Sequence, residues 1–164
     1  GANLAIGSDA DGDMYYRASS VLARLAKGAA NFKQFMNAGA TAPEWANGMK
    51  VVNVGRLMTA ASGDVAYTGA GFKPSLIISL WGGDQSTDVW SVGVHDSAAK
   101  FSVFRYDSTH TSGESTLFVG LYLTTANYQK AIVKTLDADG CTLTWTLGGN
   151  PDGNWSYGTL IFFR

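Results

Sequence analysis

The sequence predicts an all-β protein, in which an antiparallel β-sandwich or jelly roll follows a short stalk-like leader. From Val51 onward, short runs rich in aromatic and β-branched residues alternate with turn clusters, and no window there has a 3.6-residue period. Before that point, apolar residues occur in ones and twos among Gly, Ala, Ser and Asn. Regularly spaced short strands are typical of sandwiches and jelly rolls. We therefore divide the 164 residues into a leader, 1–50, and a C-terminal domain, 51–164.

The leader is predicted to consist of short strands and turns. Asp11-Gly12-Asp13 and Ala38-Gly39-Ala40 are turn signals, and Pro43 favours an extended residue before it. The run VLARLAK, residues 21–27, is too short to be stable as an isolated helix. Such a segment cannot bury a core of its own. We therefore expect it to find its partner surface in other copies of the chain.

The C-terminal domain is predicted to hold at least seven strands. Short strands are expected near Val51 to Leu57 and Val65 to Tyr67. The clearer runs follow in order: Ser75 to Trp81, Asp88 to Val94, Lys100 to Tyr106, Thr116 to Leu123, Lys130 to Leu136, Cys141 to Leu147 and Trp155 to Phe163.

Alternation assigns faces to two of these strands. In residues 141–147, Cys141, Leu143, Trp145 and Leu147 share one face and three threonines share the other, as expected for a half-exposed strand. In residues 116–123, both faces are apolar, which predicts cover on both sides. A small two-sheet sandwich has one inner face per strand. The second cover is therefore expected to come from a neighbouring subunit.

Charge and composition argue against several classes of partner. The net charge is −1, charged residues make up only 15% of the chain, and no basic patch is apparent, so we expect no nucleic-acid partner. No apolar run is long enough for a membrane-spanning helix, so no membrane insertion is expected. The single cysteine, Cys141, cannot form an intrachain disulfide and is expected to be a buried, inert thiol.

The sequence offers little material for catalysis, cofactors or metals. It contains no GxSxG, HExxH, P-loop or CxxC motif, and we expect neither an enzyme nor a cofactor. Two alternatives remain: a dyad of Cys141 with His95 or His110, and a glycosidase-like carboxylate pair. The carboxylates available in predicted loops are Asp84, Asp88, Asp96, Asp107 and Glu114, and their alternative role is to cap backbone amides. Asp9-x-Asp11-Gly12-Asp13 resembles the start of a calcium loop, but its glycine spacing is wrong, which favours a turn over a metal site; a cation on a trimer axis or at an interface is the alternative.

Recognition has better material, because aromatic and polar residues are interleaved in the predicted loops. The candidate binding residues are Trp81, Asp84, Gln85, Tyr106, Asp107, His110 and Glu114. An aromatic ring covers the apolar face of a sugar, while neighbouring amides and carboxylates bond its hydroxyls. The alternative is that strand-end aromatics such as Trp81 and Trp155 plug the ends of the sandwich.

Counting strands places these loops at one end. If successive strands alternate in direction, residues 82–87 and 107–115 lie at the end remote from Val51. By the same count His95-Asp96, the Tyr128 loop and Asn150 to Asn154 lie at the opposite end.

The leader resembles a segment found in tail fibres of tailed bacteriophages and in related virion fibres. In that segment a Gly-Asp-x-x-Tyr-Arg motif precedes Leu-Ala-Arg-Leu and a Gly-rich stretch that ends in Pro-x-Trp. The matching residues are Gly12, Asp13, Tyr16, Arg17, Leu22, Ala23, Arg24, Leu25, Gly28, Pro43 and Trp45. The chain departs from the pattern at Gly28-Ala29-Ala30-Asn31. Residues 68–80 and 136–146 are similar to terminal domains of phage fibres, where an aromatic residue commonly stands in place of Cys141.

This resemblance implies a homotrimeric fibre with an intertwined stalk and a terminal knob, located on the virion as a tail or head fibre. It implies attachment to a host cell-surface receptor, a polysaccharide or a protein, with other virion proteins on the N-terminal side. The alternatives are a head fibre or capsid-decorating spike without a receptor and, less favoured, a polysaccharide depolymerase.

Overall fold

The computed structural model describes residues 10–37, 39–83, 89–105 and 111–164, and these form strands and turns without a helix. The all-β prediction is confirmed. The chain divides into two compact units, Gly1–Gly48 and Met49–Arg164, close to the boundary expected after residue 50. We describe each unit by itself and call them the N-terminal unit and the sandwich.

The N-terminal unit contains two antiparallel hairpins. β1 (Met14–Ala18) pairs with β2 (Val21–Leu25), and β3 (Lys33–Met36) pairs with β4 (Pro43–Ala46). The residues VLARL therefore form a strand, as expected for a run too short to be a helix. Large apolar side chains such as Val21 and Met36 are exposed on this unit. Each hairpin alone has no core, and isolated hairpins are marginally stable.

Contacts between a few motif residues hold the N-terminal unit together. The Asp13 carboxylate accepts hydrogen bonds from the backbone N–H of Lys27 (2.8 Å) and of Ala10 (2.9 Å). The indole Nε1–H of Trp45 donates to the carbonyl of Ala26 at 2.8 Å. The Trp45 ring lies so close to Gly28 that a Cβ there would come within 2.6 Å of it. The two hairpins are thus joined through one ring, and glycine at position 28 is a steric requirement.

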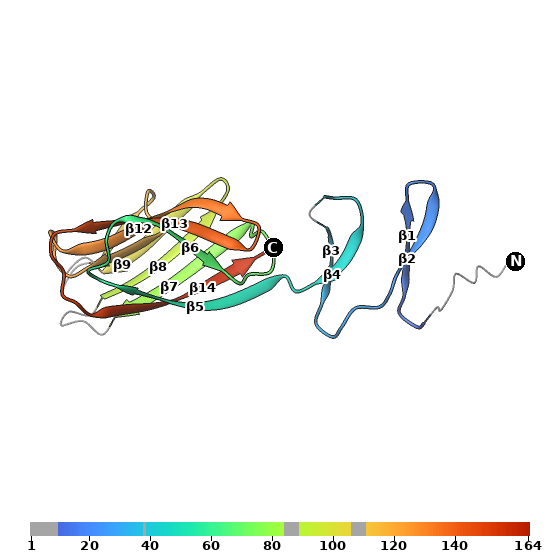
Figure 1. Ribbon diagram of the computed structural model, residues 1–164, viewed down its shortest axis with the longest axis horizontal. Helices are drawn as coiled ribbons and strands as arrows, with labels where there is room; N and C mark the ends of the chain where they lie inside the picture. The colour runs from blue at the N-terminus through green and yellow to red at the C-terminus, as the bar shows by residue number, and fades with distance from the viewer. Residues whose placement is uncertain (1–9, 38, 84–88, 106–110) are drawn as a thin grey trace, which may run out of the picture. The chain divides into compact units, whose positions relative to one another are not determined.

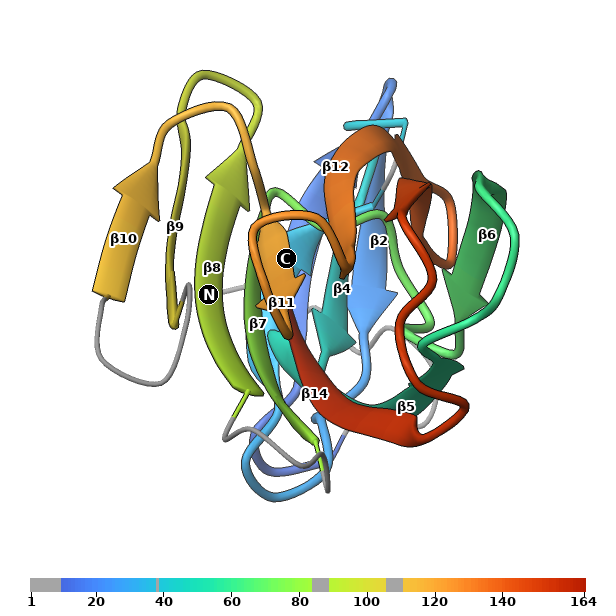
Figure 2. The ribbon, with the colours of Figure 1, turned by 90° about the vertical axis from the view of Figure 1, so that its left-hand side faces the viewer.

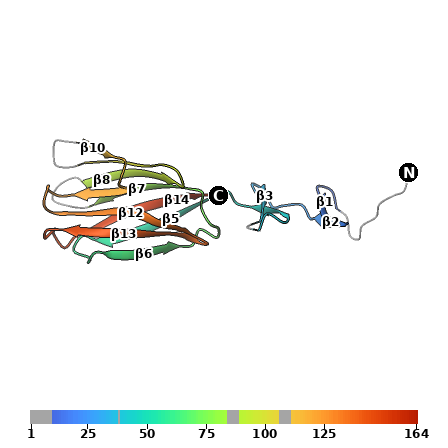
Figure 3. The same ribbon diagram turned by 90° about the horizontal axis from the view of Figure 1, so that it is seen from above.

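The sandwich consists of two antiparallel sheets whose strands run along the same long direction (Figures 1 and 3). The six-stranded sheet has the order β10-β9-β8-β7-β14-β5, which Figure 2 shows as one layer. The four-stranded sheet has the order β11-β12-β13-β6. The bounds are β5 (Met49–Leu57), β6 (Gly63–Thr68), β7 (Leu76–Gly83), β8 (Val89–Asp96), β9 (Lys100–Arg105), β10 (Thr111–Glu114), β11 (Val119–Tyr122), β12 (Tyr128–Asp137), β13 (Gly140–Gly148) and β14 (Trp155–Phe163).

Aromatic and branched side chains fill the space between the sheets. Trp145 and Leu143 of β13 are buried, as their alternation predicted, together with Phe162 of β14 and Ile77 of β7. Trp145 meets Trp81 edge to face, with ring centroids 5.4 Å apart. The guanidinium of Arg56 lies 4.5 Å from the centre of the Trp145 ring, so the core also contains a cation–π contact.

Strand β11 lies directly on small residues of the six-stranded sheet. The Ser79 hydroxyl donates to the carbonyl of Phe118 (3.1 Å), and the Gly120 N–H donates to the Ser91 hydroxyl (3.0 Å). A Cβ at Gly93 would collide with the Phe118 carbonyl oxygen and would lie 2.7 Å from the Ser79 hydroxyl. The β11 backbone can approach the sheet this closely because the residues beneath it, Ser and Gly, have small side chains or none.

The prediction that both faces of this strand are covered is confirmed, but the cover comes from the same chain. Val119 and Leu121 belong to the main core, while Tyr122 stacks on Phe104 of β9 with ring centroids 5.1 Å apart. The Phe104 ring also lies against Gly120, where a Cβ would come within 2.6 Å of it. The doubly apolar run 116–123 is therefore no argument for a neighbouring subunit.

Substitution of Gly93 by Ala should destabilise the sandwich strongly. The added methyl group meets backbone rather than a movable side chain, so we expect a loss of about 3 kcal/mol in the free energy of unfolding. Gly82→Ala, on the next strand, is the matched control, because a Cβ there meets only the Val89 carbonyl oxygen at 3.8 Å. The control should be neutral or slightly stabilising. Urea denaturation of both variants tests this, and equal midpoints would contradict the described packing of β11.

The contacts of Asp13 should weaken in acid. Its pKa lies below the ordinary value, chiefly because the carboxylate accepts the Lys27 N–H and secondly the Ala10 N–H. A lowered folded-state pKa means that this stabilisation is complete above the ordinary value and is lost as pH falls through the folded one. The Lys27 amide NMR shift should therefore titrate below about pH 4, and the titration should vanish in Asp13→Asn. A Lys27 shift that is constant to pH 2 in the native protein would refute the contact.

Candidate functional site

Five of the seven predicted binding residues lie outside the described residues: Asp84, Gln85, Tyr106, Asp107 and His110. The structure does place the strand ends that flank them. β7 ends at Gly83 and β8 begins at Val89, while β9 ends at Arg105 and β10 begins at Thr111. Trp81 and Glu114 are described. Trp81 is buried, whereas Glu114 is exposed.

Trp81 is not a surface residue. Its side chain is 4% exposed and packs edge to face on Trp145, between the two sheets. It alternates with Ile77 and Ser79 on the inner face of β7, so the run SLIISLW places it in the core. The binding interpretation of Trp81 is therefore wrong, and the alternative of a plugging aromatic is correct for this residue.

The described carboxylates serve as strand and turn residues. Glu114 is exposed at the end of the edge strand β10, where it pairs with Ser102 of β9. Asp96 accepts hydrogen bonds from the backbone N–H groups of Ala98 and Ala99, and these lower its pKa, the Ala99 bond most. This is the amide-capping role rather than half of a catalytic pair.

The sandwich has two ends, which we name the Met49 end and the Leu57 end after the limits of β5. Strand pairing places Gly83 beside Ser156 and Trp155 beside Leu57, so β7 ends and β14 begins at the Leu57 end. β14 finishes beside the start of β5, with Phe163 paired to Met49. The C-terminus consequently lies at the Met49 end (Figure 1).

The connections 58–62, 123–127 and 149–154 also lie at the Leu57 end. The Asn127 side chain accepts the Asn150 N–H (2.9 Å), and the Asn154 carbonyl accepts the Met58 N–H (3.0 Å). The prediction that the Tyr128 loop and Asn150–Asn154 occupy the opposite end is therefore wrong. Thr111–Glu114 is a strand, although the sequence pattern predicts a loop there, and this additional strand reverses the direction of every later one. The placement of His95-Asp96 at the Met49 end is correct.

A buried polar network fixes the backbone at the Leu57 end. Arg56 donates from Nε to the Gln129 side-chain oxygen (3.0 Å) and from Nη2 to the carbonyl of Ala61 (2.8 Å). Gln129 donates in turn to the carbonyls of Met58 (2.9 Å) and Ala60 (2.6 Å). Desolvation lowers the pKa of Arg56 below its ordinary value. These bonds tie the connection after β5 to β12 of the opposite sheet, so this end has a rigid base.

Two exposed aromatic rings lie side by side on the outer face of β14, near the Leu57 end. Trp155 and Tyr157 of β14 are 50% and 61% exposed, their ring centroids are 6.4 Å apart, and their planes differ by 20°. Tyr157 is flanked across the sheet by Gly55 and Gly82, which have no side chains to cover it. The two rings therefore form a nearly parallel pair that faces away from the core.

Polar groups adjoin this pair on the same face. Thr159 follows Tyr157 by two residues, and its hydroxyl donates to the Asn53 side-chain oxygen at 3.1 Å. Both are in register across β14 and β5. We call Trp155, Tyr157, Thr159 and Asn53 the aromatic patch.

Neither ring is among the seven binding residues predicted from the sequence, where Trp155 is expected to plug the end of the sandwich. The signal that marks them is the alternation of WSYGTL, in which the buried Ser156 sets both aromatics on the outer face.

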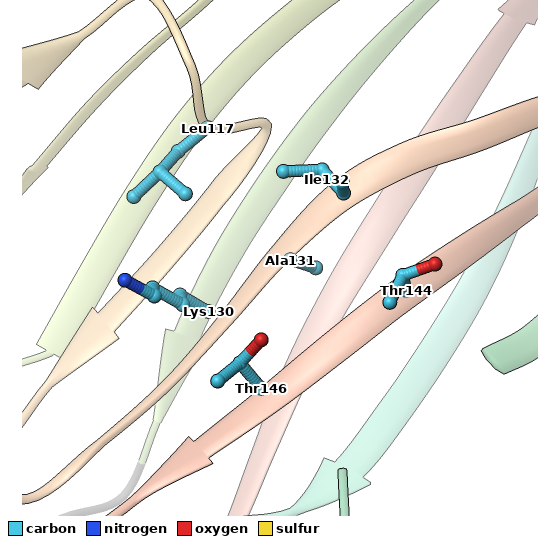
Figure 4. A pocket seen from close by; sticks show the side chains of 6 residues that line it. All are labelled: Leu117, Lys130, Ala131, Ile132, Thr144 and Thr146. Carbon is cyan, nitrogen blue, oxygen red and sulfur yellow. The ribbon is translucent and has the colours of Figure 1, made fainter. Parts of the chain in front are cut away.

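The described part of the chain has a small surface depression and one buried cysteine. A depression on the outer face of the four-stranded sheet, lined by Lys130, Ile132, Thr144 and Thr146 among others, encloses about 70 Å³ (Figure 4). Small-molecule sites typically enclose roughly 300–1,000 Å³. Cys141 is fully buried, and burial, aided by Asp137, raises the pKa of its thiol to about 12, which agrees with an inert thiol.

His95 lies in β8 rather than in a loop. Its burial, more than the nearby Lys100, lowers its pKa below the usual value. Among the described residues, no group of three or more His, Cys, Asp or Glu side chains is arranged to hold a metal ion. Nor does any helix in those residues have the length and apolarity to span a membrane.

No family model matches this chain, and comparisons with curated proteins and with solved structures likewise return no significant match.

Proposed function

We propose that the chain is a non-enzymatic bacteriophage fibre protein, and that the Leu57 end of its sandwich attaches the virion to a host cell-surface glycan. The N-terminal unit would then belong to a homotrimeric stalk that joins other virion proteins. The observation that carries the receptor part is the aromatic patch, an exposed pair of rings beside hydrogen-bonding side chains.

The N-terminal unit supports the fibre part of this proposal. The residues that carry the resemblance to phage fibres are the ones that make its internal contacts: Asp13 binds two backbone amides, and Trp45 closes over Gly28. Arg24 lies 3.6 Å from the Asp13 carboxylate. The motif therefore describes how two hairpins are joined. Val21 and Leu22 are exposed on these hairpins, and burying such apolar side chains against other copies of the chain would favour assembly.

The chemistry of the aromatic patch fits a saccharide. A pyranose has an apolar face of C–H groups that packs on an aromatic ring, and hydroxyls around its rim that need partners. Trp and Tyr provide large, rigid contact areas at little entropic cost, and they dominate many binding surfaces. Thr159 and Asn53 provide a hydroxyl and an amide on the same face.

Replacing the two rings should abolish attachment without unfolding the protein. We expect Trp155→Ala with Tyr157→Ala to weaken binding to bacterial cells and to arrayed bacterial surface polysaccharides by at least about tenfold, or roughly 1.4 kcal/mol. The melting temperature should change little because both rings are exposed. Alanine at Asp84, Tyr106 and His110, whose connections begin and end at the same end, should also reduce binding.

The matched control is Ile132→Ala, which removes an exposed apolar side chain from the opposite sheet and should leave binding unchanged. Removing surface glycans from the cells should eliminate binding of the unmodified chain. Binding that survives in the Trp155/Tyr157 variant would exclude the patch. A chain that binds no cells or polysaccharides at all would favour the structural-spike alternative.

A further inference from the structure

The two outer faces of the sandwich differ in chemical character. On the four-stranded sheet, Thr144 lies between Ile132 and Asp64 in register, and Asp64 is bonded to Thr144 and paired with Lys134. Such a polar outer face is what water-exposed sheets normally have. The outer face of the six-stranded sheet is apolar over most of its area.

Strand register shows how continuous this apolar surface is. One row crosses five strands, from β9 to β5, and consists of Phe101, Val94, Ile78, Ile161 and Val51. The next row, toward the Leu57 end, adds Val103, Val92 and Leu80 before it reaches Thr159 of the aromatic patch. We call these two rows the apolar face.

Solvent exposure confirms that the apolar face points away from the core. Val92 is 40% exposed, and Leu80, Val94 and Phe101 are exposed to a similar or greater extent. The residues that alternate with them, Ser79, Ser91 and Gly93, are buried under β11. Nothing within the described sandwich covers the outer side chains.

The apolar face is large enough to form the centre of a subunit interface. With strands about 4.8 Å apart and residues on the same face about 6.6 Å apart along each strand, its eight residues occupy about 250 Å² in projection. Contiguous exposed apolar patches of a few hundred Å² often mark interaction sites. A standard interface buries about 800 Å² per partner, so this face can supply its apolar centre.

The character of the face selects the partner. Its rows contain no charged side chain, so two copies meet without like-charge repulsion, and a polar ligand such as a glycan finds few hydrogen-bonding partners there. The N-terminal unit of the same chain also exposes apolar residues, and only two residues separate the end of β4 from the start of β5. Assembly of one unit therefore raises the local concentration of the other.

We infer that the apolar face of the six-stranded sheet is buried against other copies of this chain, and that it is a principal contact of the assembled sandwich. This rests on the self-assembly proposed above, and it places the contact on the two apolar rows, leaving Trp155 and Tyr157, which lie on the same outer face nearer the Leu57 end, outside it.

The first test introduces a charge at matched positions on the two outer faces. Val92→Glu and Ile132→Glu replace β-branched residues that are 40% and 39% exposed, in the middle of strands of opposite sheets. Sedimentation equilibrium of the full chain, 17.4 kDa per copy, should show an oligomer for the native protein and for Ile132→Glu. Val92→Glu should raise the dissociation constant at least about tenfold, because assembly would bury an unpaired carboxylate. A monomeric native chain, or equal constants for the two variants, would overturn the inference.

The second test needs no disruptive charge and keeps the inference falsifiable if Val92→Glu fails to fold. Val92→Cys and Ile132→Cys each add one thiol, while the native Cys141 is buried with a raised pKa and should stay unreactive. Maleimide should label the thiol at position 92 at least about tenfold more slowly than that at position 132 under assembling conditions. Equal rates would show that the face is open to solvent.

These outcomes are separable from those of the receptor experiment. If Val92→Glu loses its oligomerisation, and the native chain binds cells with high avidity through the aromatic patch, both the interface and the receptor proposal are supported. An unchanged oligomer with patch-dependent binding overturns the interface alone. A native dimer that Val92→Glu disrupts keeps the interface and contradicts the trimeric stoichiometry.

Discussion

The close approach of β11 to the inner surface of the six-stranded sheet is the contact on which the sandwich depends. It requires small residues at three neighbouring positions, Ser79, Ser91 and Gly93, and uses two of their hydroxyls to bond the β11 segment. Because β11 is the edge strand of the four-stranded sheet, this contact sets the separation of the two sheets on that side. It also places Phe104 over Gly120, which closes the second cluster of buried rings.

Strand identity and face could be predicted wherever the side-chain pattern was strong. The alternation of Cys141, Leu143 and Trp145 fixes the buried face of β13, and the run 75–81 fixes β7. β10, by contrast, has the sequence TSGE, which contains no large apolar residue to mark it as a strand. It forms because β9 offers an open edge, and backbone pairing needs no particular side chain. Without β10 in the strand count, every later strand is assigned the opposite direction.

The candidate site was harder to predict than the fold, because sequence alone does not separate an aromatic on the inner face from one on the outer face near a strand end. Trp81 and Trp155 both stand near turns, yet the first is in the core and the second is half exposed. The buried serines show which face each ring is on. Trp81 lies two residues after the buried Ser79 and so shares its inner face. Trp155 directly precedes the buried Ser156 and so lies on the outer face. In this sheet the inner face contains buried serines, so the usual rule that polar residues face outward fails here.

The pairing of Met49 with Phe163 brings the first and last strands of the sandwich together at one end, away from the aromatic patch. A domain whose first and last strands end side by side can be replaced by another domain in evolution, because the chain that precedes it does not have to change its course. Insertions and deletions in connections at the other end likewise leave the joining geometry unaffected. Under the proposed function, this architecture allows the connections at the Leu57 end to vary in sequence while the strand ends that join the sandwich to the preceding chain stay the same.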